Sequence, residues 1–143
     1  MIDIKEIRVG NYFNLENEKE IVFVDSILSL DKEILYSTIN SKKYSFVGLS
    51  YLLPIKITED LLLQLGFQKE VDEISKEGFY MYLPNGFRID INKYSNTLGR
   101  DYGIHIDNLS CDSVLSGDIQ YLHQLQNYIY DATKQELNIE NIS

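Results

Sequence analysis

The sequence predicts an α+β fold, with a small antiparallel β-rich N-terminal unit (residues 1–54) followed by an α-β-β-β-α layer (residues 55–143). Three observations carry this prediction. Short strand-like runs separated by polar turns fill the region before Pro54. Alternating apolar runs flank the dipeptide Asn85-Gly86, which is a strong hairpin signal. The segment 119–137 has the periodicity of a long amphipathic helix.

The N-terminal unit is predicted from its strand-like segments, which cover residues 7–15, 20–28, 33–39 and 43–47. The first segment is interrupted at Gly10-Asn11, and such a pair within a strand marks a bulge or a bend. Short strands in close succession are typical of a small, curled antiparallel sheet or barrel. Because the linker around Pro54 is short and apolar, we expect both units to pack as one compact body.

A short helix begins the second unit. Thr58 is a suitable N-cap, and Glu59 and Asp60 follow in the first turn, where the helix dipole favours anions. Gly66 comes directly after the last apolar residue, as a left-handed C-terminal glycine does. Phe67 then supplies the apolar contact that often accompanies this cap. The pattern predicts a helix of about two turns.

Strands of the second unit are predicted at residues 78–83, 87–91 and 102–107 because apolar side chains alternate there with polar ones. Residues 107–117 are polar and are predicted to form a loop. Ser116 or Asp118 is then the expected cap of the last helix.

The last helix has a wide apolar arc of roughly 200° at 100° per residue. A surface helix usually shows a stripe of about 100° or somewhat more. We therefore expect this helix to be nearly buried or to pack against two elements at once. Tyr121, Tyr128 and Tyr130 lie on the apolar arc, and tyrosine is favoured at protein interfaces. They predict a homo-oligomer, with a dimer as the first expectation.

The opposite arc of this helix is polar but almost uncharged. It carries Gln120, His123, Gln124, Asn127 and Asp131, of which only Asp131 has a formal charge. A solvated face would normally hold Lys and Glu, so these side chains suit specific hydrogen bonds. Gln120, His123, Gln124 and Asn127 are therefore candidate ligand-binding residues. The structural alternative is a histidine that hydrogen-bonds a neighbouring sheet or loop.

A second candidate site lies in the loop 96–103. It places two glycines close to Arg100 and Tyr102. An arginine can neutralise the charge of a nucleotide, and a tyrosine can stack on it. The loop matches neither a P-loop nor a dinucleotide fingerprint. A plain hairpin connection is the structural alternative.

No enzymatic, metal or cofactor signature is present in the sequence. With two histidines and no His-Glu-x-x-His pattern, a metal site at His123 would need a further ligand such as His105 or Asp131. A small hydrolase that uses His123 or His105 with a carboxylate is the enzymatic alternative, but no nucleophile–base–orienter set can be named. We therefore expect no catalysis, no metal and no cofactor.

Composition and charge exclude several functions. A net charge of −9 disfavours binding to duplex nucleic acid or to an anionic membrane surface. The single cysteine, Cys111, rules out an internal disulfide and fits a reducing compartment. The N-terminus lacks a signal-peptide pattern, and no apolar run approaches the roughly 20 residues of a membrane span. We expect a cytoplasmic protein, in the host cytoplasm if a phage encodes it.

Three motifs carry a resemblance to known sequences. They are Ile7-Arg8-Val9-Gly10-Asn11-Tyr12, the segment Pro54 to Phe67 with Pro-Ile-x-Ile-Thr-Glu and Leu-Gly-Phe, and the segment Tyr121 to Ile129 with His-Gln-Leu-Gln-Asn. With these motifs the chain resembles an uncharacterised family of small proteins from Bacteroidetes genomes, their prophages and phages. Where the second motif commonly carries a tryptophan, this chain has Leu61. The resemblance implies a phage or mobile-element context and supplies no activity.

These inferences lead to two hypotheses for function. The first is a non-enzymatic phage or prophage accessory protein that sequesters a nucleotide signal of host defence, with Arg100, Tyr102, His123 and Asn127 as contacts. The net charge argues against an anionic ligand unless the pocket is locally basic. The alternative is an acidic inhibitor or adaptor that blocks a basic host protein.

Overall fold

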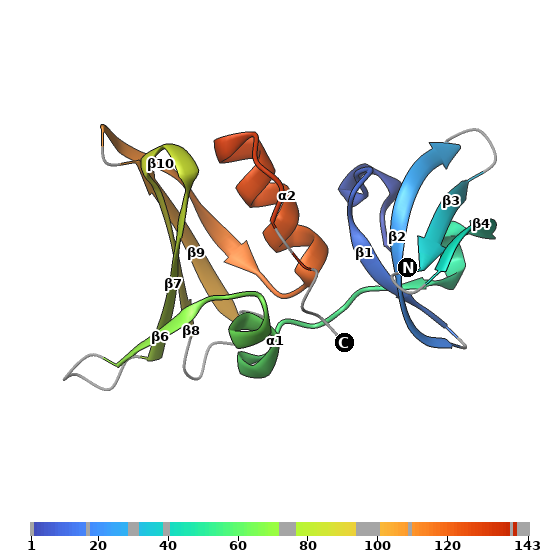
Figure 1. Cartoon of the computed structure of the whole chain (residues 1–143), viewed down its shortest axis with the longest axis horizontal. Coiled ribbons are helices and arrows are strands. Elements are labelled where there is room, and N and C mark those ends of the chain that lie inside the picture. Colours follow the sequence, from blue (N-terminus) through green and yellow to red (C-terminus); the bar gives the residue numbers. More distant parts are fainter. Residues whose placement is uncertain are drawn as a thin grey trace. The chain divides into compact units, whose positions relative to one another are not determined.

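Two five-stranded antiparallel sheets make up most of the computed structural model (Figure 1). The structure describes residues 2–16, 18–28, 32–38, 41–71, 77–93, 101–108, 110–137 and 139. The chain divides into a first unit, Met1–Lys56 with Tyr121–Asn127, and a second unit, Ile57–Gln120 with Tyr128–Ser143. Together with the helices, the sheets confirm the predicted α+β class.

The first unit contains a sheet with the strand order β4-β3-β2-β1-β5. Its strands are β1 (Tyr12–Leu15), β2 (Glu18–Leu28), β3 (Glu33–Thr38), β4 (Ser41–Gly48) and β5 (Leu52–Leu53). Two short 3-10 helices, η1 (Ile4–Glu6) and η2 (Leu49–Tyr51), precede β1 and β5. The predicted N-terminal strands are confirmed, and the first of them is shorter than predicted. Gly10 has a φ of 98°, and the turn at this residue delays the start of β1 to Tyr12.

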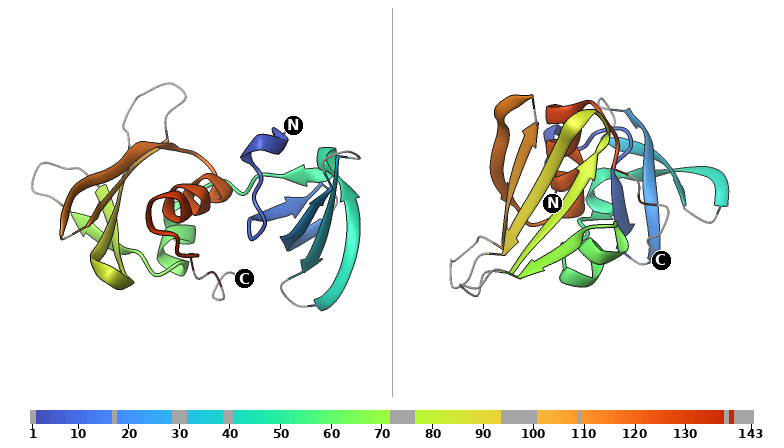
Figure 2. Two further views of the ribbon diagram at one scale, coloured as in Figure 1. Left: turned by 90° about the horizontal axis from the view of Figure 1, so that it is seen from above. Right: turned by 60° about the vertical axis from the view of Figure 1, so that its left-hand side comes forward.

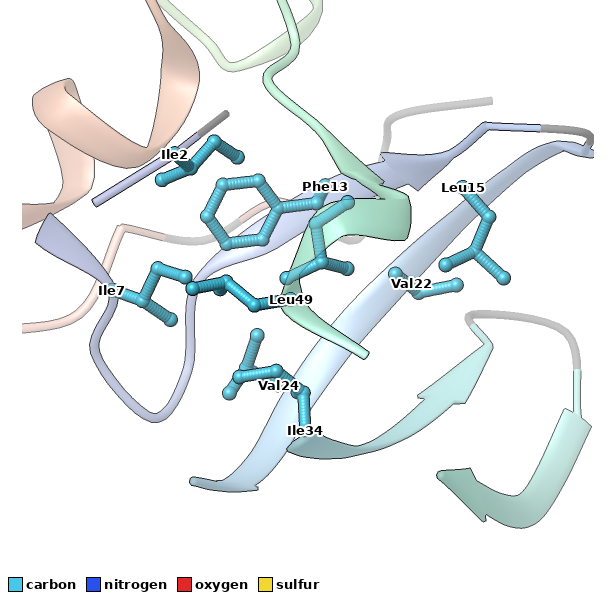
Figure 3. Packing of buried hydrophobic residues seen from close by; sticks show 9 residues of the cluster. Ile2, Ile7, Phe13, Leu15, Val22, Val24, Ile34 and Leu49 are labelled. Atoms are coloured by element: carbon cyan, nitrogen blue, oxygen red, sulfur yellow. The ribbon is translucent and has the colours of Figure 1, made fainter. Parts of the chain in front are cut away.

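One face of this sheet forms the core of the first unit (Figure 3). Alternate residues of the central strands are buried there, since successive side chains of a strand point to opposite faces. The cluster consists of Ile2, Ile7, Phe13, Leu15, Val22, Val24, Ile34, Leu49 and Leu52. Burial of side chains of this size contributes about 1.5–3 kcal/mol each to folding.

The second unit contains a sheet with the strand order β10-β9-β8-β7-β6. Its strands are β6 (Gln68–Val71), β7 (Glu77–Leu83), β8 (Phe87–Lys93), β9 (Tyr102–Asn108) and β10 (Cys111–Ile119). The helix α1 (Glu59–Gln64) precedes β6, and a 3-10 turn η3 (Pro84–Gly86) joins β7 to β8. Figure 2 shows the twist of the strands in both units from two further directions.

Local sequence signals in the second unit are confirmed at atomic detail. The Thr58 hydroxyl accepts a hydrogen bond from the Leu61 N–H at 3.1 Å, as an N-cap does. Gly66 has a φ of 99°, and the Phe67 N–H donates to the Leu62 carbonyl at 3.0 Å in a Schellman cap. Asn85-Gly86 has positive φ at both residues, as the predicted hairpin turn requires.

The predicted loop over residues 107–117 is wrong, because most of it forms β10. This strand lies at the edge of the sheet, and Ser116 and Asp118 are exposed on it. The polar residues of this segment therefore reflect the solvent-exposed face of an edge strand and not a loop. The glycine at position 117 is explained by tertiary packing, because a Cβ at this position would lie 2.7 Å from Cζ of Tyr128. β6 is a further strand that the sequence pattern did not indicate, so the sheet has five strands rather than three.

The last helix is α2 (Leu122–Thr133), which is shorter than the predicted segment because Ile119 ends β10. Its predicted caps, Ser116 and Asp118, lie within β10 instead. The Gln124 side chain accepts a hydrogen bond from the Tyr121 N–H at 3.1 Å and so takes the capping role. Residues 121–127 belong to the first unit, whereas the sequence placed them with the second.

Candidate functional site

The start of α2 is attached to the first unit by backbone contacts. The Leu122 N–H donates to the Ile55 carbonyl at 2.8 Å, and Lys56 forms an isolated antiparallel bridge with Tyr121. These contacts fix the first turn of the helix, which carries His123. The polar arc that the sequence singled out therefore meets the β-rich unit at this point.

His123 is buried between two aromatic rings. Its side chain is 1% exposed, and its ring centroid lies 5.0 Å from that of Phe13 and 5.9 Å from that of Tyr121. The Tyr121 ring is stacked, with an interplanar angle of 12°. Both aromatic contacts add packing to the buried imidazole.

Neither ring nitrogen of His123 has a hydrogen-bond partner among the residues that the structure describes. The Glu6 carboxylate lies close to the ring, with Oε2 at 3.7 Å from Nε2. This distance exceeds that of a normal hydrogen bond. Since most buried polar atoms are paired, and an unpaired one costs about 1–3 kcal/mol, an unpaired buried imidazole needs an explanation.

A cavity of about 310 Å³ lies against His123, and we call it the His123 cavity. All of its lining residues belong to the first unit: Ile2, Glu6, Ser50, Leu52, Leu53, Pro54, Tyr121 and His123. Most of this wall is apolar, and polar atoms come from the hydroxyls, the imidazole and the Glu6 carboxylate. Mostly apolar walls with a few convergent polar groups are typical of small-molecule sites, and the volume is at the lower end of their range of about 300–1,000 Å³.

The pKa of His123 is lowered from its ordinary value near 6.5, chiefly because burial disfavours the charged imidazolium. The nearby Glu6 carboxylate acts in the opposite direction but does not reverse the shift. His123 is therefore neutral at pH 7. A neutral imidazole offers one N–H donor and one acceptor nitrogen.

Two other polar side chains of α2 form hydrogen bonds through both the oxygen and the nitrogen of their amide groups. Gln126, which is 1% exposed, accepts from the Tyr12 N–H and donates to the Gly10 carbonyl, both at 3.0 Å. Asn127 accepts from the Asn11 amide at 2.9 Å and donates to the Glu6 carbonyl at 2.8 Å. These bonds hold the turn before β1 against the helix.

Five of the six predicted ligand-binding residues are described by the structure, and among these His123 alone lines the His123 cavity. Gln124 caps α2, Asn127 holds the turn before β1, and the Gln120 carbonyl accepts from the Ile57 N–H. Tyr102 is buried in β9 of the second unit, and Arg100 lies outside the described residues. The structure therefore brings none of the other four described residues into the cavity.

Glu6 and Gln126 are the residues that sequence reasoning missed. Gln126 lies within the apolar arc of α2, and a polar residue at such a position is a usable signal of a buried hydrogen-bonding role. Glu6 gave no such signal, because its proximity to His123 comes from the opposite end of the chain.

The other histidine lies on the outer face of the second sheet. His105 Nε2 is 2.7 Å from Asp107 Oδ1, and both side chains are partly exposed. A shallow hollow of about 350 Å³ next to it includes Asn92, Ser116 and Asp118. His105 thus has a carboxylate neighbour in contact with solvent, which makes this region a weaker candidate than the His123 cavity.

Three further observations concern metal binding, membrane-spanning helices and similarity to known proteins. In the described part of the chain, no group of three or more His, Cys, Asp or Glu side chains is arranged to hold a metal ion. The helices found among the same residues lack the length and apolar character needed to cross a bilayer.

Comparison of the chain with protein-family models, with curated proteins and with solved structures gives no match.

Proposed function

We propose that the protein is a non-enzymatic binding protein that holds a small planar ligand with an amino group in the His123 cavity. The observation that carries the proposal is the buried, unpaired imidazole beside Glu6 at the cavity wall. Both imidazole nitrogens are inaccessible to solvent in the structure, so a ligand pairs with them only if a neighbouring side chain of the wall moves aside. Such a ligand recovers the cost of the unpaired atoms as binding free energy.

The chemistry of the wall favours a ligand that donates hydrogen bonds. The Glu6 carboxylate only accepts, and a neutral His123 accepts at one of its nitrogens. An amino group on a heterocycle has N–H bonds for both acceptors. The flat ring that carries it suits the apolar wall formed by Ile2, Leu52 and Pro54.

The charge at the cavity wall restricts which part of a nucleotide can be the ligand. Among the described residues that line the cavity, Glu6 alone carries a formal charge, and the chain has a net charge of −9. A phosphate would be repelled there, so the proposed ligand is a nucleobase or nucleoside rather than a free nucleotide. In the phage context that the sequence resemblance implies, binding of this kind would withdraw a base-containing signal from host defence.

Isothermal titration calorimetry with two nucleosides that differ at one exocyclic group tests this proposal. Cytidine and uridine differ in an amino group against a carbonyl, so we expect cytidine to bind at least about tenfold more tightly. CMP is expected to bind more weakly than cytidine. His123→Phe should abolish binding, Glu6→Gln should reduce the preference for cytidine, and His105→Phe should leave both unchanged.

Native mass spectrometry of the gently purified protein provides an independent test. Release of a stoichiometric small molecule with an amino-substituted ring would support the proposal. Equal affinity for cytidine and uridine would contradict recognition of the amino group. Preparations without a bound small molecule that also bind no nucleoside would contradict the proposal as a whole.

A second candidate function is an acidic inhibitor or adaptor of a basic protein. The outer face of the second sheet favours it, because it carries Glu70, Asp90, Asp107 and Asp118 on four neighbouring strands, with the first two in ion pairs with Arg88. Affinity capture with the wild type and with a Glu70→Gln, Asp107→Asn, Asp118→Asn variant tests this function. A basic protein should bind the wild type in a salt-sensitive way and be lost from the variant.

A further inference from the structure

Residues 2–8 form a segment that borders His123, and we call this segment the strap. It contains η1 and contributes Ile2 and Glu6 to the wall of the His123 cavity. The Glu6 Oε2 lies 3.7 Å from His123 Nε2, and both imidazole nitrogens are inaccessible to solvent. A ligand on this side of the cavity therefore reaches the imidazole only if the strap gives way.

Other parts of the cavity wall are held by backbone hydrogen bonds. Leu52 and Leu53 belong to β5, which pairs with β1, and the Leu122 N–H donates to the Ile55 carbonyl at the start of α2. Such paired backbone opens only together with a larger part of the fold. The strap lies outside the strands of the sheet, so it is the part of the wall best able to move by itself.

Asn127 holds the strap against α2. Its Nδ2 donates to the Glu6 carbonyl at 2.8 Å, and its Oδ1 accepts from Arg8 Nε at 3.3 Å and from Asn11 Nδ2 at 2.9 Å. Asn127 comes four residues after His123 and so lies on the same face of the helix. One side chain thus links the strap to the helix that carries the buried imidazole.

The chain changes its mode of attachment between the strap and β1. Val9 is 49% exposed, and Gly10 has a φ of 98°, which glycine adopts without strain. The Gly10 N–H donates to the Val24 carbonyl at 2.9 Å and so attaches the chain to β2. Val9 and Gly10 are therefore the natural hinge for a movement of the strap.

We propose that the strap is a lid over His123 and that Asn127 latches it in the closed position. Opening breaks the bond between Asn127 and the Glu6 carbonyl and moves Ile2 and Glu6 away from the imidazole. Ile2 and Ile7 are buried in the core of the first unit (Figure 3), so the closed state is favoured in the free protein. The inference rests on the proposed function, because a lid over His123 has a use only if a ligand binds there.

Carbethoxylation by diethyl pyrocarbonate tests the lid without any ligand. The reagent modifies the nitrogen of a neutral imidazole, so its rate at His123 reports how often that nitrogen is exposed. When closing is fast, this rate is proportional to the population of the open state. A His105→Phe background leaves His123 as the only histidine of the chain, and peptide mass spectrometry locates the adduct.

Two latch variants should raise the rate by different amounts. Asn127→Ala removes all the latch bonds, so we expect the rate at His123 to rise at least about tenfold. Asn127→Asp keeps acceptor oxygens for Arg8 and Asn11 but cannot donate to the Glu6 carbonyl, so its rate should be intermediate. The matched control is Asp131→Ala, an exposed position one turn further along α2, which should leave the rate unchanged.

Global unfolding also exposes His123, and dilute urea controls for it. The wild type is brought in urea to the same free energy of unfolding as Asn127→Ala. We expect the variant still to react faster, because its opening is local. Equal rates at matched stability would overturn the lid, and so would an unchanged rate in a folded Asn127→Ala variant.

Binding of cytidine separates the lid from the proposed function. If both hold, Asn127→Ala should increase the association rate of cytidine, and bound cytidine should protect His123 from the reagent. Faster carbethoxylation in the latch variants without any nucleoside binding would support the lid and contradict the proposed function. Cytidine binding together with carbethoxylation that neither latch variant changes would support the proposed function and overturn the lid.

Discussion

His123 and Gln126 lie one turn apart on α2 and are equally buried, each with 1% exposure. Gln126 pairs its amide oxygen with the Tyr12 N–H and its amide nitrogen with the Gly10 carbonyl. His123 pairs neither of its nitrogens with any described residue and adjoins a cavity. The two side chains share a helix and a unit but differ in hydrogen bonding.

This difference separates a structural polar residue from a binding residue. A buried amide that meets the free backbone groups of a strand stabilises the fold, because those groups would otherwise be unpaired. A buried imidazole without partners lowers the stability of the fold and has value only if something else pairs with it. The hydrogen-bonding state, more than burial, therefore points to His123 as the binding residue of this helix.

Replacing Gln126 should have the largest effect on stability. Gln126→Leu leaves the Tyr12 N–H and the Gly10 carbonyl unpaired, so we expect the free energy of unfolding to fall by about 2–4 kcal/mol. The matched control is Gln124→Leu on the same helix. It removes the capping bond to the Tyr121 N–H and should cost no more than about 1 kcal/mol. Urea denaturation measures both, and equal losses would contradict the structural role of Gln126.

Sequence reasoning succeeded where the determining chemistry is local. Thr58, Gly66 and Asn85-Gly86 were identified because a cap or a tight turn needs particular residue types within a few positions. β10 was missed because an edge strand with one exposed face can be polar, and its Gly117 is explained by Tyr128 on another element. Tertiary context decided that case.

The site shows the same limit. Helical periodicity identified His123 as an unusual residue, but its significance depends on Phe13 and Glu6 at the opposite end of the chain. The same periodicity placed Asn127 beside it, although Asn127 is bonded to Asn11 and to the Glu6 carbonyl. A single sequence gives the polarity of a helix face but not the partners that its side chains meet.

The stability of the wild type should depend on pH through His123. Its pKa is lowered in the folded state by burial, so below about pH 6.5 the unfolded chain binds a proton that the folded chain does not. Stability is then lost as the pH falls below this value, by up to about 1.4 kcal/mol per pH unit until the folded pKa is reached.

The variant His123→Phe isolates this dependence. The variant keeps every other titratable residue of the chain, so the difference in unfolding free energy between wild type and variant should change between pH 7.5 and 5, with the wild type losing more. A difference that stays constant over this range would show that His123 titrates alike in the folded and unfolded chains.

The smallest expected effect is that of His123→Phe on stability at pH 7.5. Phenylalanine keeps an aromatic ring between Phe13 and Tyr121 and removes two unpaired nitrogens. We therefore expect a change within about 1 kcal/mol, in the stabilising direction, from thermal or urea unfolding. A loss of more than about 2 kcal/mol would mean that His123 is paired in the folded protein and acts as a structural residue like Gln126. A stable variant that no longer binds ligand would instead separate the binding role of His123 from the fold.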